Sequence, residues 1–401
     1  MTPGSRPSAR PGPARRRAPQ RLLVPAAAVL ALVTGCAPGA DAGGQASPAS
    51  APATSARPAP AEGPPPPAGR PVTNPAGTLL VADFGADTVT FVDPAKGAIA
   101  SVRVGTAPYG LALGADGRAW VATAEGVAVV DTRTRERIAL VPYATDSGPV
   151  ATGEYRGGGM GIALSPDGAH AYVGVNVPGG NGTLEIVDTR DLTVTGTVPV
   201  GRRPFDVDVS RDGAEVYVTN HDSFDVTVVP AATAGGEGGT RRIEVAPYGT
   251  EGGLGSWLKP HYAVVRPSDG RLLLPFEGER LAEVDPRTGR TEIRAMTADT
   301  HQHGATVTPD GTLLVVGTGP VDPASDQGAS LTVRRPDGTE RIIPLDGPHE
   351  NVAVSKDGRT AYVTGGFTRD GSWDGLTVVD LASGDTRRVA AGERPLGVVV
   401  L

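Results

Sequence analysis

Short apolar runs alternate with polar turns through most of the chain, and six of these turns share the sequence Asp-Gly. They lie at residues 116–117, 167–168, 212–213, 269–270, 310–311 and 357–358, so the pattern returns every 41 to 57 residues. Asp and Gly both tolerate the positive φ of a tight β-hairpin turn. Each unit is therefore predicted to be a hairpin meander that buries its apolar face against copies of itself.

The unit that begins at Arg203 shows how many strands to expect. RPFDVDVSRDG leads into AEVYVTN, then DVTVVP, then TRRIEVA, which fits four antiparallel strands. The second strand contains Tyr217-Val218-Thr219-Asn220, and the sequences AYVGVN and AYVTGG stand at the same place in their units, at 171–176 and 361–366. In these motifs residues 73–401 resemble the YVTN-repeat β-propellers of bacterial surface proteins. The resemblance implies an all-β fold built from four-stranded blades.

The two ends of this region complete each other. Residues 74–83 match 308–317 but lack an apolar strand before their turn, whereas residues 393–401 form such a strand with no partner after it. We expect the C-terminal strand to be the innermost strand of the first blade, because this closes the ring without an exposed sheet edge. The predicted fold is a seven-bladed β-propeller, and the alternative is an open solenoid with an unpaired last strand.

The N-terminus resembles a bacterial lipoprotein signal peptide. Four arginines at 15–17 and 21 precede an apolar run at 22–33, which is too short to span a membrane as a helix, and Val33-Thr34-Gly35-Cys36 follows. Residues 1–35 are therefore interpreted as a cleaved signal, and Cys36, the single cysteine, as the lipidated residue. The expected location is the cell membrane, with a lipid anchor on the extracytoplasmic side. Arg16-Arg17 leaves open whether export follows the general or the twin-arginine route.

Residues 36–72 are rich in Ala, Pro, Gly and Ser, a composition typical of a semi-extended linker. The propeller domain is then 73–401. The whole chain has a net charge of −7, and residues 1–35 carry arginines but no acidic residue, so the mature surface is still more acidic and argues against nucleic acid as a partner. We expect a monomer whose partners are the membrane, through its lipid, and a small ligand or a surface protein.

One face of the predicted propeller carries the long connections. Residues 141–159 and 246–260 precede inner strands, and residues 176–183, 317–329 and 365–375 lie between second and third strands, all of which emerge at the same end of the channel. The opposite face keeps the tight Asp-led turns. Because function concentrates on loops held by a rigid scaffold, the first face is predicted to contain the site.

Histidines gather at this channel mouth. The first residues of the inner strands align as Tyr109, Met160, Phe205, His261, His303, either His349 or Glu350, and Leu396. Neutral imidazoles that converge from separate strands suit a borderline metal such as copper or zinc. We predict His261, His303 and His349 as metal ligands, similar in position to the histidine-lined propeller mouths of nitrous oxide reductase and the selenium-binding-protein/methanethiol oxidase family. No other cofactor is expected.

Two alternatives to metal binding stay open. The histidines can be polar channel liners of a protein-interaction scaffold, or one of them can perform acid/base chemistry on a small molecule with a glutamate as partner, as in lactonase and streptogramin-lyase propellers. No catalytic residue is assigned, and whether the protein is an enzyme stays open. The further rim candidates are His301, His221, Glu350, Tyr109, Glu154, Glu277, Trp257 and Trp373.

Overall fold

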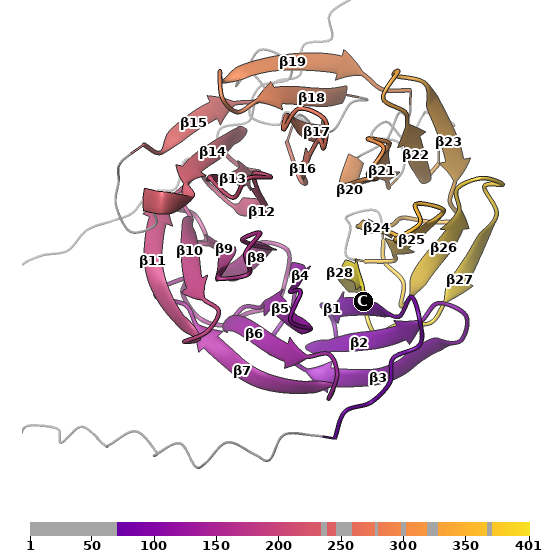
Figure 1. Ribbon diagram of the computed structural model, residues 1–401, viewed down its shortest axis with the longest axis horizontal. Helices are drawn as coiled ribbons and strands as arrows, with labels where there is room; N and C mark the ends of the chain where they lie inside the picture. The colour runs from indigo at the N-terminus through magenta and orange to yellow at the C-terminus, as the bar shows by residue number, and fades with distance from the viewer. Residues whose placement is uncertain are drawn as a thin grey trace, which may run out of the picture. The chain divides into compact units, whose positions relative to one another are not determined.

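The computed structural model describes residues 70–233, 239–245, 259–276, 280–297, 302–318, 328–366 and 371–401. These residues form seven four-stranded antiparallel sheets arranged as a ring (Figure 1). The predicted all-β, seven-bladed propeller is therefore confirmed. The signal segment, Cys36 and the linker up to residue 69 lie outside the described residues.

Each blade runs from an inner strand at the channel to an outer strand at the rim (Figure 1). Blade 1 contains β28 (Pro395–Val400), β1 (Leu79–Asp83), β2 (Thr88–Asp93) and β3 (Gly97–Arg103). Blade 2 contains β4 (Leu111–Leu113), β5 (Arg118–Ala122), β6 (Gly126–Asp131) and β7 (Glu136–Pro142). Blade 3 contains β8 (Gly158–Leu164), β9 (His170–Asn176), β10 (Thr183–Asp188) and β11 (Thr193–Pro199).

The second half of the ring repeats this order. Blade 4 contains β12 (Pro204–Val209), β13 (Glu215–Asn220), β14 (Asp225–Pro230) and, after a short 3₁₀ turn at Ala231–Thr233, β15 (Arg241–Glu244). Blade 5 contains β16 (Val264–Val265), β17 (Leu272–Phe276), β18 (Arg280–Asp285) and β19 (Arg290–Ala295). Blade 6 contains β20 (Gln302–Val307), β21 (Leu313–Gly317), β22 (Ser330–Arg334) and β23 (Glu340–Pro344). Blade 7 contains β24 (Val352–Val354), β25 (Thr360–Thr364), β26 (Leu376–Asp380) and β27 (Thr386–Val389).

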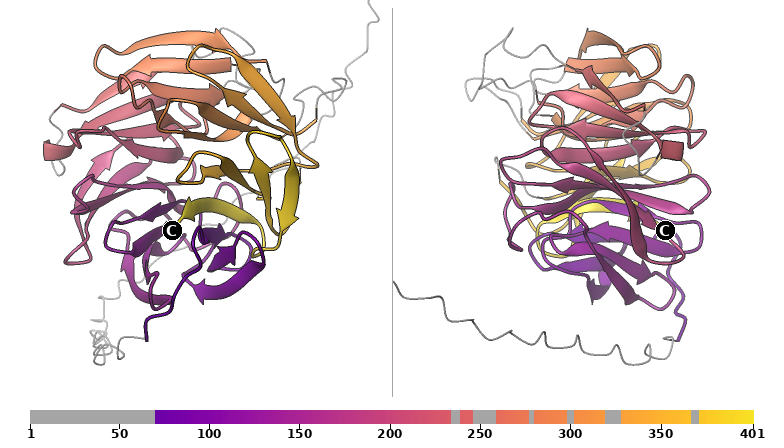
Figure 2. Two further views of the ribbon diagram at one scale, coloured as in Figure 1. Left: turned by 45° about the vertical axis from the view of Figure 1, so that its right-hand side comes forward. Right: turned by 90° about the vertical axis from the view of Figure 1, so that its left-hand side faces the viewer.

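The ring closes through the C-terminal strand, as the sequence predicts. β28 pairs antiparallel with β1, with Leu79 opposite Val400 and Val81 opposite Val398, and the two views of Figure 2 show this strand inside the first blade. Leu79, Leu80 and Val81 are fully buried. An open solenoid is thereby excluded for the described residues.

Alternating side chains of the strands pack between neighbouring blades rather than within one blade. A separate apolar core fills each blade-to-blade interface, such as Val218, Val216 and Leu184 between blades 3 and 4 and Leu274, Ala282 and Val226 between blades 4 and 5. Because a blade buries its apolar faces only against its neighbours, the fold is stable only as a ring.

The topology gives the propeller two distinct faces. The upper face is where inner strands begin and second strands end, and the lower face carries the Asp-Gly turns. The chain enters the propeller at the lower face, since the backbone N–H of Val72 donates to the carbonyl of Arg133 at 2.7 Å and Asn74 donates to the carbonyl of Thr132 at 2.9 Å, both in the turn after β6. Within the described residues, no helix is long and apolar enough to cross a membrane.

Candidate functional site at the channel mouth

The residues that begin the inner strands meet at the upper end of the channel. On one side, Tyr109, Met160, Phe205 and Leu396 pack with Phe84, Ala107 and Tyr262 into an apolar cluster. Phe205 contacts the ring of Tyr109 edge-on at a centroid distance of 5.5 Å and that of Tyr262 at 5.2 Å. This cluster forms the aromatic wall of the mouth, and it contains four of the seven residues that the strand alignment predicts there.

Histidines from three successive blades form the other side. The ring centroids of His221 and His261 are 4.6 Å apart, and those of His261 and His303 are 4.3 Å apart with nearly parallel planes. We call His221, His261, His303 and Glu350 the imidazole row, because Glu350 of blade 7 continues it: its Oε2 lies 3.1 Å from Nδ1 of His303. The row therefore connects blades 4, 5, 6 and 7 across the mouth.

A carboxylate stands at each end of the row. At the blade 4 end, Nδ1 of His221 lies 2.6 Å from Oδ1 of Asp222. Burial lowers the pKa of His221 to about 3, although the hydrogen bond to Asp222 opposes the shift. His221 is therefore neutral at pH 7, with Nδ1–H donating to Asp222.

At the other end, Glu350 is held by the backbone of two blades. Its own N–H donates to the carbonyl of Thr364 at 2.8 Å, and its carbonyl accepts from the N–H of Gly304 at 2.9 Å, in blade 6. The side chain is 1% exposed and that of His303 is nearly as buried. A carboxylate at Nδ1 favours the tautomer in which Nε2 carries the lone pair, the form that acts as a base or a metal ligand.

His349, the third predicted metal ligand, makes different contacts. Its Nδ1 lies 2.7 Å from the carbonyl of Gly347 and its Nε2 lies 2.7 Å from the hydroxyl of Thr377. Its ring also contacts Trp373 at 5.6 Å, and burial lowers its pKa to about 4. Both ring nitrogens are thus engaged inside blade 7, and Glu350 occupies the position that faces His303.

The remaining rim candidates divide into three groups. Tyr109 lies in the aromatic wall, where burial, followed by the charge of Glu350, raises its pKa. Glu154 and Trp373 contact arginines: Oε1 of Glu154 lies 3.1 Å from Nη2 of Arg203, and Arg388 covers the ring of Trp373 at 4.5 Å. His301, Glu277 and Trp257 lie outside the described residues.

The sequence patterns do not predict two buried arginines at the mouth. Arg156 donates to the carbonyls of Ala107, Gly157 and Gly159 at 2.6 to 2.9 Å, and burial lowers its pKa to about 10. Arg203 is 2% exposed and places Nη1 3.5 Å from Nδ1 of His221. The mouth thus contains one guanidinium group beside the aromatic wall, that of Arg156, and one beside the imidazole row, that of Arg203.

A repeated motif could have revealed Arg203. Each of the tripeptides Ala107-Pro108-Tyr109, Arg203-Pro204-Phe205 and Arg394-Pro395-Leu396 ends in a residue of the aromatic wall and begins with a residue at positive φ, of 49°, 54° and 48°. The turn into the inner strand therefore places the residue before the proline at the rim of the mouth.

Metal-ligating side chains do not surround a common point in the part of the chain that the structure describes: no group of three or more His, Cys, Asp or Glu has the arrangement of a metal site there. The nearly parallel stacking of His261 on His303 explains this for the row, because it directs the ring edges side by side instead of toward one centre.

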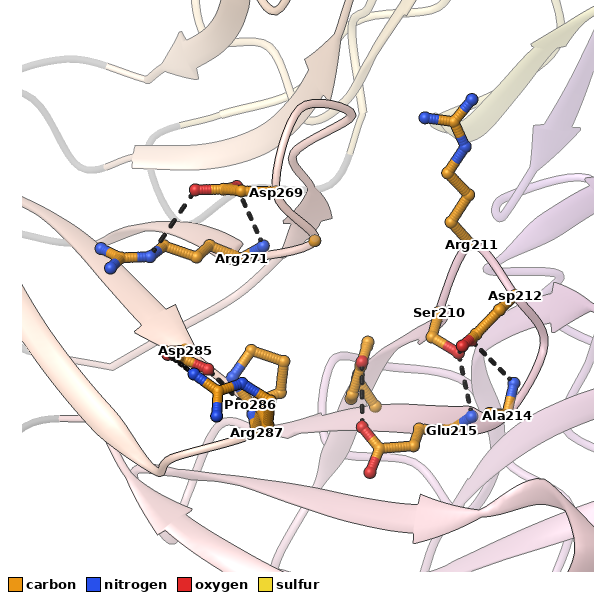
Figure 3. Close-up of a pocket in the computed structure, with 12 residues that line it drawn as sticks. Ser210, Arg211, Asp212, Ala214, Glu215, Asp269, Arg271, Asp285, Pro286 and Arg287 are labelled. Atoms are coloured by element: carbon orange, nitrogen blue, oxygen red, sulfur yellow. Dashed lines mark hydrogen bonds and ion pairs between the residues drawn. The ribbon is translucent and has the colours of Figure 1, made fainter.

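The lower face contains a cavity of about 900 Å³ between blades 4 and 5. Figure 3 shows two charged pairs in its wall: Arg271 approaches Asp269 at 3.6 Å and Arg287 approaches Asp285 at 3.8 Å. Arg211 extends away from these pairs and donates to the carbonyl of Pro267 at 3.1 Å. Glu215 at its wall pairs with Arg241 at 2.7 Å. Because these charges satisfy one another at the surface, the mouth is the stronger candidate for the functional site.

The fold and the mouth define a seven-bladed β-propeller with a buried polar site at one end of its channel. No protein-family model and no curated protein matches the chain. Among solved structures, it is similar to the periplasmic gluconolactonase PpgL of Pseudomonas aeruginosa, with TM-score 0.57, 16% identity and coverage of 81% of this chain and 99% of that one.

Two other structures illustrate how widely this fold is shared. A functionally unknown protein of Desulfotomaculum acetoxidans has TM-score 0.60 and 12% identity over 81% of this chain and 99% of its own. The hydrazine synthase of Kuenenia stuttgartiensis has TM-score 0.54 and 19% identity over 68% and 76%. At these identities the likeness establishes the fold and no activity.

Proposed function

We propose that the channel mouth binds a small molecule and hydrolyses it, with a cyclic ester (lactone) as the substrate class. The observation that carries this proposal is the buried contact between His303 and Glu350, at 3.1 Å. A carboxylate that orients an imidazole is the arrangement by which proteins make a general base near neutral pH. The similarity to a propeller that is itself a gluconolactonase supports the substrate class.

The chemistry needs little beyond these two residues. His303 accepts a proton from water as the water oxygen bonds to the lactone carbonyl carbon. The ring C–O bond then breaks, and the same proton passes to the leaving oxygen, so that the product is a hydroxy acid. Glu350 holds His303 in one tautomer and stabilises its protonated form, and the aromatic wall of Phe205, Tyr109 and Tyr262 packs against the substrate ring.

Proton release during hydrolysis of glucono-1,5-lactone and related lactones tests this proposal. His303→Ala and Glu350→Gln should each lower kcat/KM by about 100-fold or more. His170→Ala is the matched control, because His170 lies on β9 near the lower face. If the wild-type protein hydrolyses no lactone above the rate in buffer, the hydrolase proposal fails and an interaction scaffold becomes the better account.

A second candidate, binding of copper or zinc, is favoured by a different observation. Both His221 and His303 have a carboxylate at Nδ1, which is the outer contact that metal-binding histidines usually make. The donor types therefore suit a borderline metal, but His261 and His303 would have to turn out of their stacked arrangement before His221, His261 and His303 could hold it. A metal held there would polarise a carbonyl or lower the pKa of a bound water.

Elemental analysis of the untagged protein separates the two candidates. Stoichiometric copper or zinc that falls strongly in His261→Ala, and activity that a chelator removes and the metal restores, would favour the metal site. Full lactone hydrolysis by metal-free protein would contradict it.

We also propose that the chain is an exported lipoprotein of the YVTN-repeat type, anchored through Cys36 to the extracytoplasmic side of the cell membrane. The mouth lies on the face opposite the point where residues 72–74 join the propeller, which supports access to it in an anchored protein. Cys36→Ala should move the protein from the membrane fraction to the soluble fraction. Unchanged membrane association after signal cleavage would contradict lipidation at Cys36.

A further inference from the structure

A small cavity lies directly beside the imidazole row on the upper face. It has a volume of about 70 Å³ and is bounded by Arg202, Arg203 and Asp222 of blade 4 and by Tyr155 and the loop at 176–180 of blade 3. We call it the side cavity. Arg203 and Asp222 both line the side cavity and contact His221, so the cavity adjoins the blade 4 end of the imidazole row.

The charges around the side cavity leave an excess cation. Glu154 pairs with Arg203 at 3.1 Å, and Asp222 pairs with Lys259 at 3.5 Å. Arg202 is exposed, and its side chain makes no ion pair with the residues that the structure describes. Three cations therefore face two carboxylates, and the surplus charge favours an anion.

Arg203 is built into the fold as a donor at this point. Tyr155 stacks on its guanidinium at 4.2 Å and Phe205 lies at 5.4 Å, which fixes the plane of the group. Its Nε–H is fully buried and has no hydrogen-bond partner in the described part of the chain. A buried N–H without an acceptor is destabilising unless a ligand supplies one.

The size of the side cavity limits what it can hold. A water molecule takes up about 30 Å³ in the liquid, so the space has room for a single carboxylate or phosphate group. Arginine is the side chain that best matches the planar, two-oxygen geometry of such groups.

We propose that the side cavity binds the anionic group of the ligand, a carboxylate or a phosphate, through Arg203 and Arg202, while the rest of the ligand lies along the imidazole row. This rests on the proposed function and narrows its substrate class to lactones that carry an acidic group at a distance from the ester. Arg202 and Arg203 are then specificity residues rather than catalytic ones.

Direct binding of inorganic phosphate and of gluconate, measured by calorimetry on the full-length protein, tests the side cavity without any turnover. Arg202→Ala should weaken binding of at least one of these anions by about tenfold or more. Arg203→Lys, which keeps the charge but not the planar fork, should also weaken it. Arg287→Ala is the matched control, because its side chain is 84% exposed and lies at the lower-face cavity.

The results of these binding experiments distinguish the proposed anion site from the proposed lactone hydrolysis. Equal anion affinity of the wild type and Arg202→Ala, or no binding of either anion to the wild type, would contradict the proposed anion site even if the protein hydrolyses lactones. If the protein binds an anion through Arg202 but hydrolyses no lactone, the proposed anion site is supported and the proposed hydrolysis is contradicted. Where both hold, Arg202→Ala should raise KM for 6-phosphogluconolactone and leave that for neutral glucono-1,5-lactone unchanged.

Discussion

The two faces of the propeller use the same residue type, aspartate, in opposite ways. On the lower face, Asp167 accepts hydrogen bonds from Ser165 and Ala169, and Asp212 accepts from Ser210 and Ala214. In each case the hydroxyl donor lowers the pKa of the carboxyl first, and the backbone N–H adds to it. Toward the upper face, Asp83 is fully buried at the end of β1, and burial raises its pKa to about 7.

The difference lies in how far along the chain each contact reaches. The lower-face carboxylates bind donors two residues away. At the mouth, Arg203 reaches Glu154 and Arg156 reaches Ala107, each across 49 residues. The Asp-Gly turns of the lower face are thus built from local contacts, whereas the site exists only when neighbouring blades pack together.

Loss of the closing strand should have the largest effect, because it removes contacts between blades and not a single turn. Deletion of residues 395–401 removes β28, leaves β1 without its inner partner and exposes the core that Val398 shares with Leu79 and Tyr362. We expect aggregation or an unfolded chain, because two sheet edges and a blade interface become exposed. Size-exclusion chromatography and circular dichroism would measure this, with a chain that begins at Arg70 as the control. A folded monomer with an unchanged Tm would contradict closure as the source of stability.

The aspartates of the two faces should give opposite dependence of stability on pH. For Asp83 the pKa in the folded protein lies above the unfolded value of 3.8, at about 7, so its contribution is fully present below pH 3.8 and is lost as the pH rises to about 7. A shift of this size corresponds to at most about 4 kcal/mol. Asp167 has a lowered pKa, so its contribution is present above the unfolded value and is lost as the pH falls below it.

Denaturant unfolding between pH 3 and pH 8 measures both effects. Asp83→Asn should flatten the loss of stability between pH 4 and pH 7 and should unfold at higher denaturant than the wild type at pH 8, because the amide keeps an acceptor for Thr88 and Thr90. Asp167→Asn is the matched change on the lower face. It should lower stability at neutral pH, where the carboxylate contributes, and should lose this effect as the pH falls below the unfolded pKa. Parallel curves for wild type and Asp83→Asn would show that Asp83 ionises normally.

The same division between local and long-range contacts explains what the sequence could predict. The blades, the closing strand and the residues Tyr109, Phe205, His261 and His303 at the mouth follow from repeats and turns, which are local signals. The sequence leaves open whether His349 or Glu350 lies at the mouth in blade 7. Alignment on the Asp-Gly turn selects Glu350, and alignment on the preceding proline selects His349. The backbone hydrogen bonds of Glu350 with Thr364 and Gly304 place Glu350 there. Arg156 and Asp222 act across blade interfaces, which no single repeat encodes.

Glycines near the two ends of one hairpin offer a finer test of the same idea. Gly161 lies in β8, where an added Cβ would lie 2.4 Å from Cα of Asp206 in the next blade, whereas Gly168 lies in the lower-face turn with φ of +71° and open space around it. Gly110, Gly304 and Gly397 repeat the close approach, each directly after a residue of the mouth. Gly161 is thus required because a neighbouring blade leaves no room for a side chain, and Gly168 because its backbone has a positive φ.

Alanine at these two positions should therefore lower the free energy of unfolding by different amounts. These are the smallest effects expected from the contrast between the two faces. Gly168→Ala should lower the free energy of unfolding by about 1 kcal/mol, the cost of a left-handed residue with a side chain, and leave the proposed lactone hydrolysis unchanged. Gly161→Ala should cost about 3 kcal/mol, because a backbone contact cannot relax without moving β8 away from β12, and it should also reduce activity by shifting Phe205 and Met160. Chemical denaturation and kcat/KM of both variants measure the difference. Equal destabilisation, with activity retained in Gly161→Ala, would show that the inner strands separate freely and that ring geometry does not position the mouth.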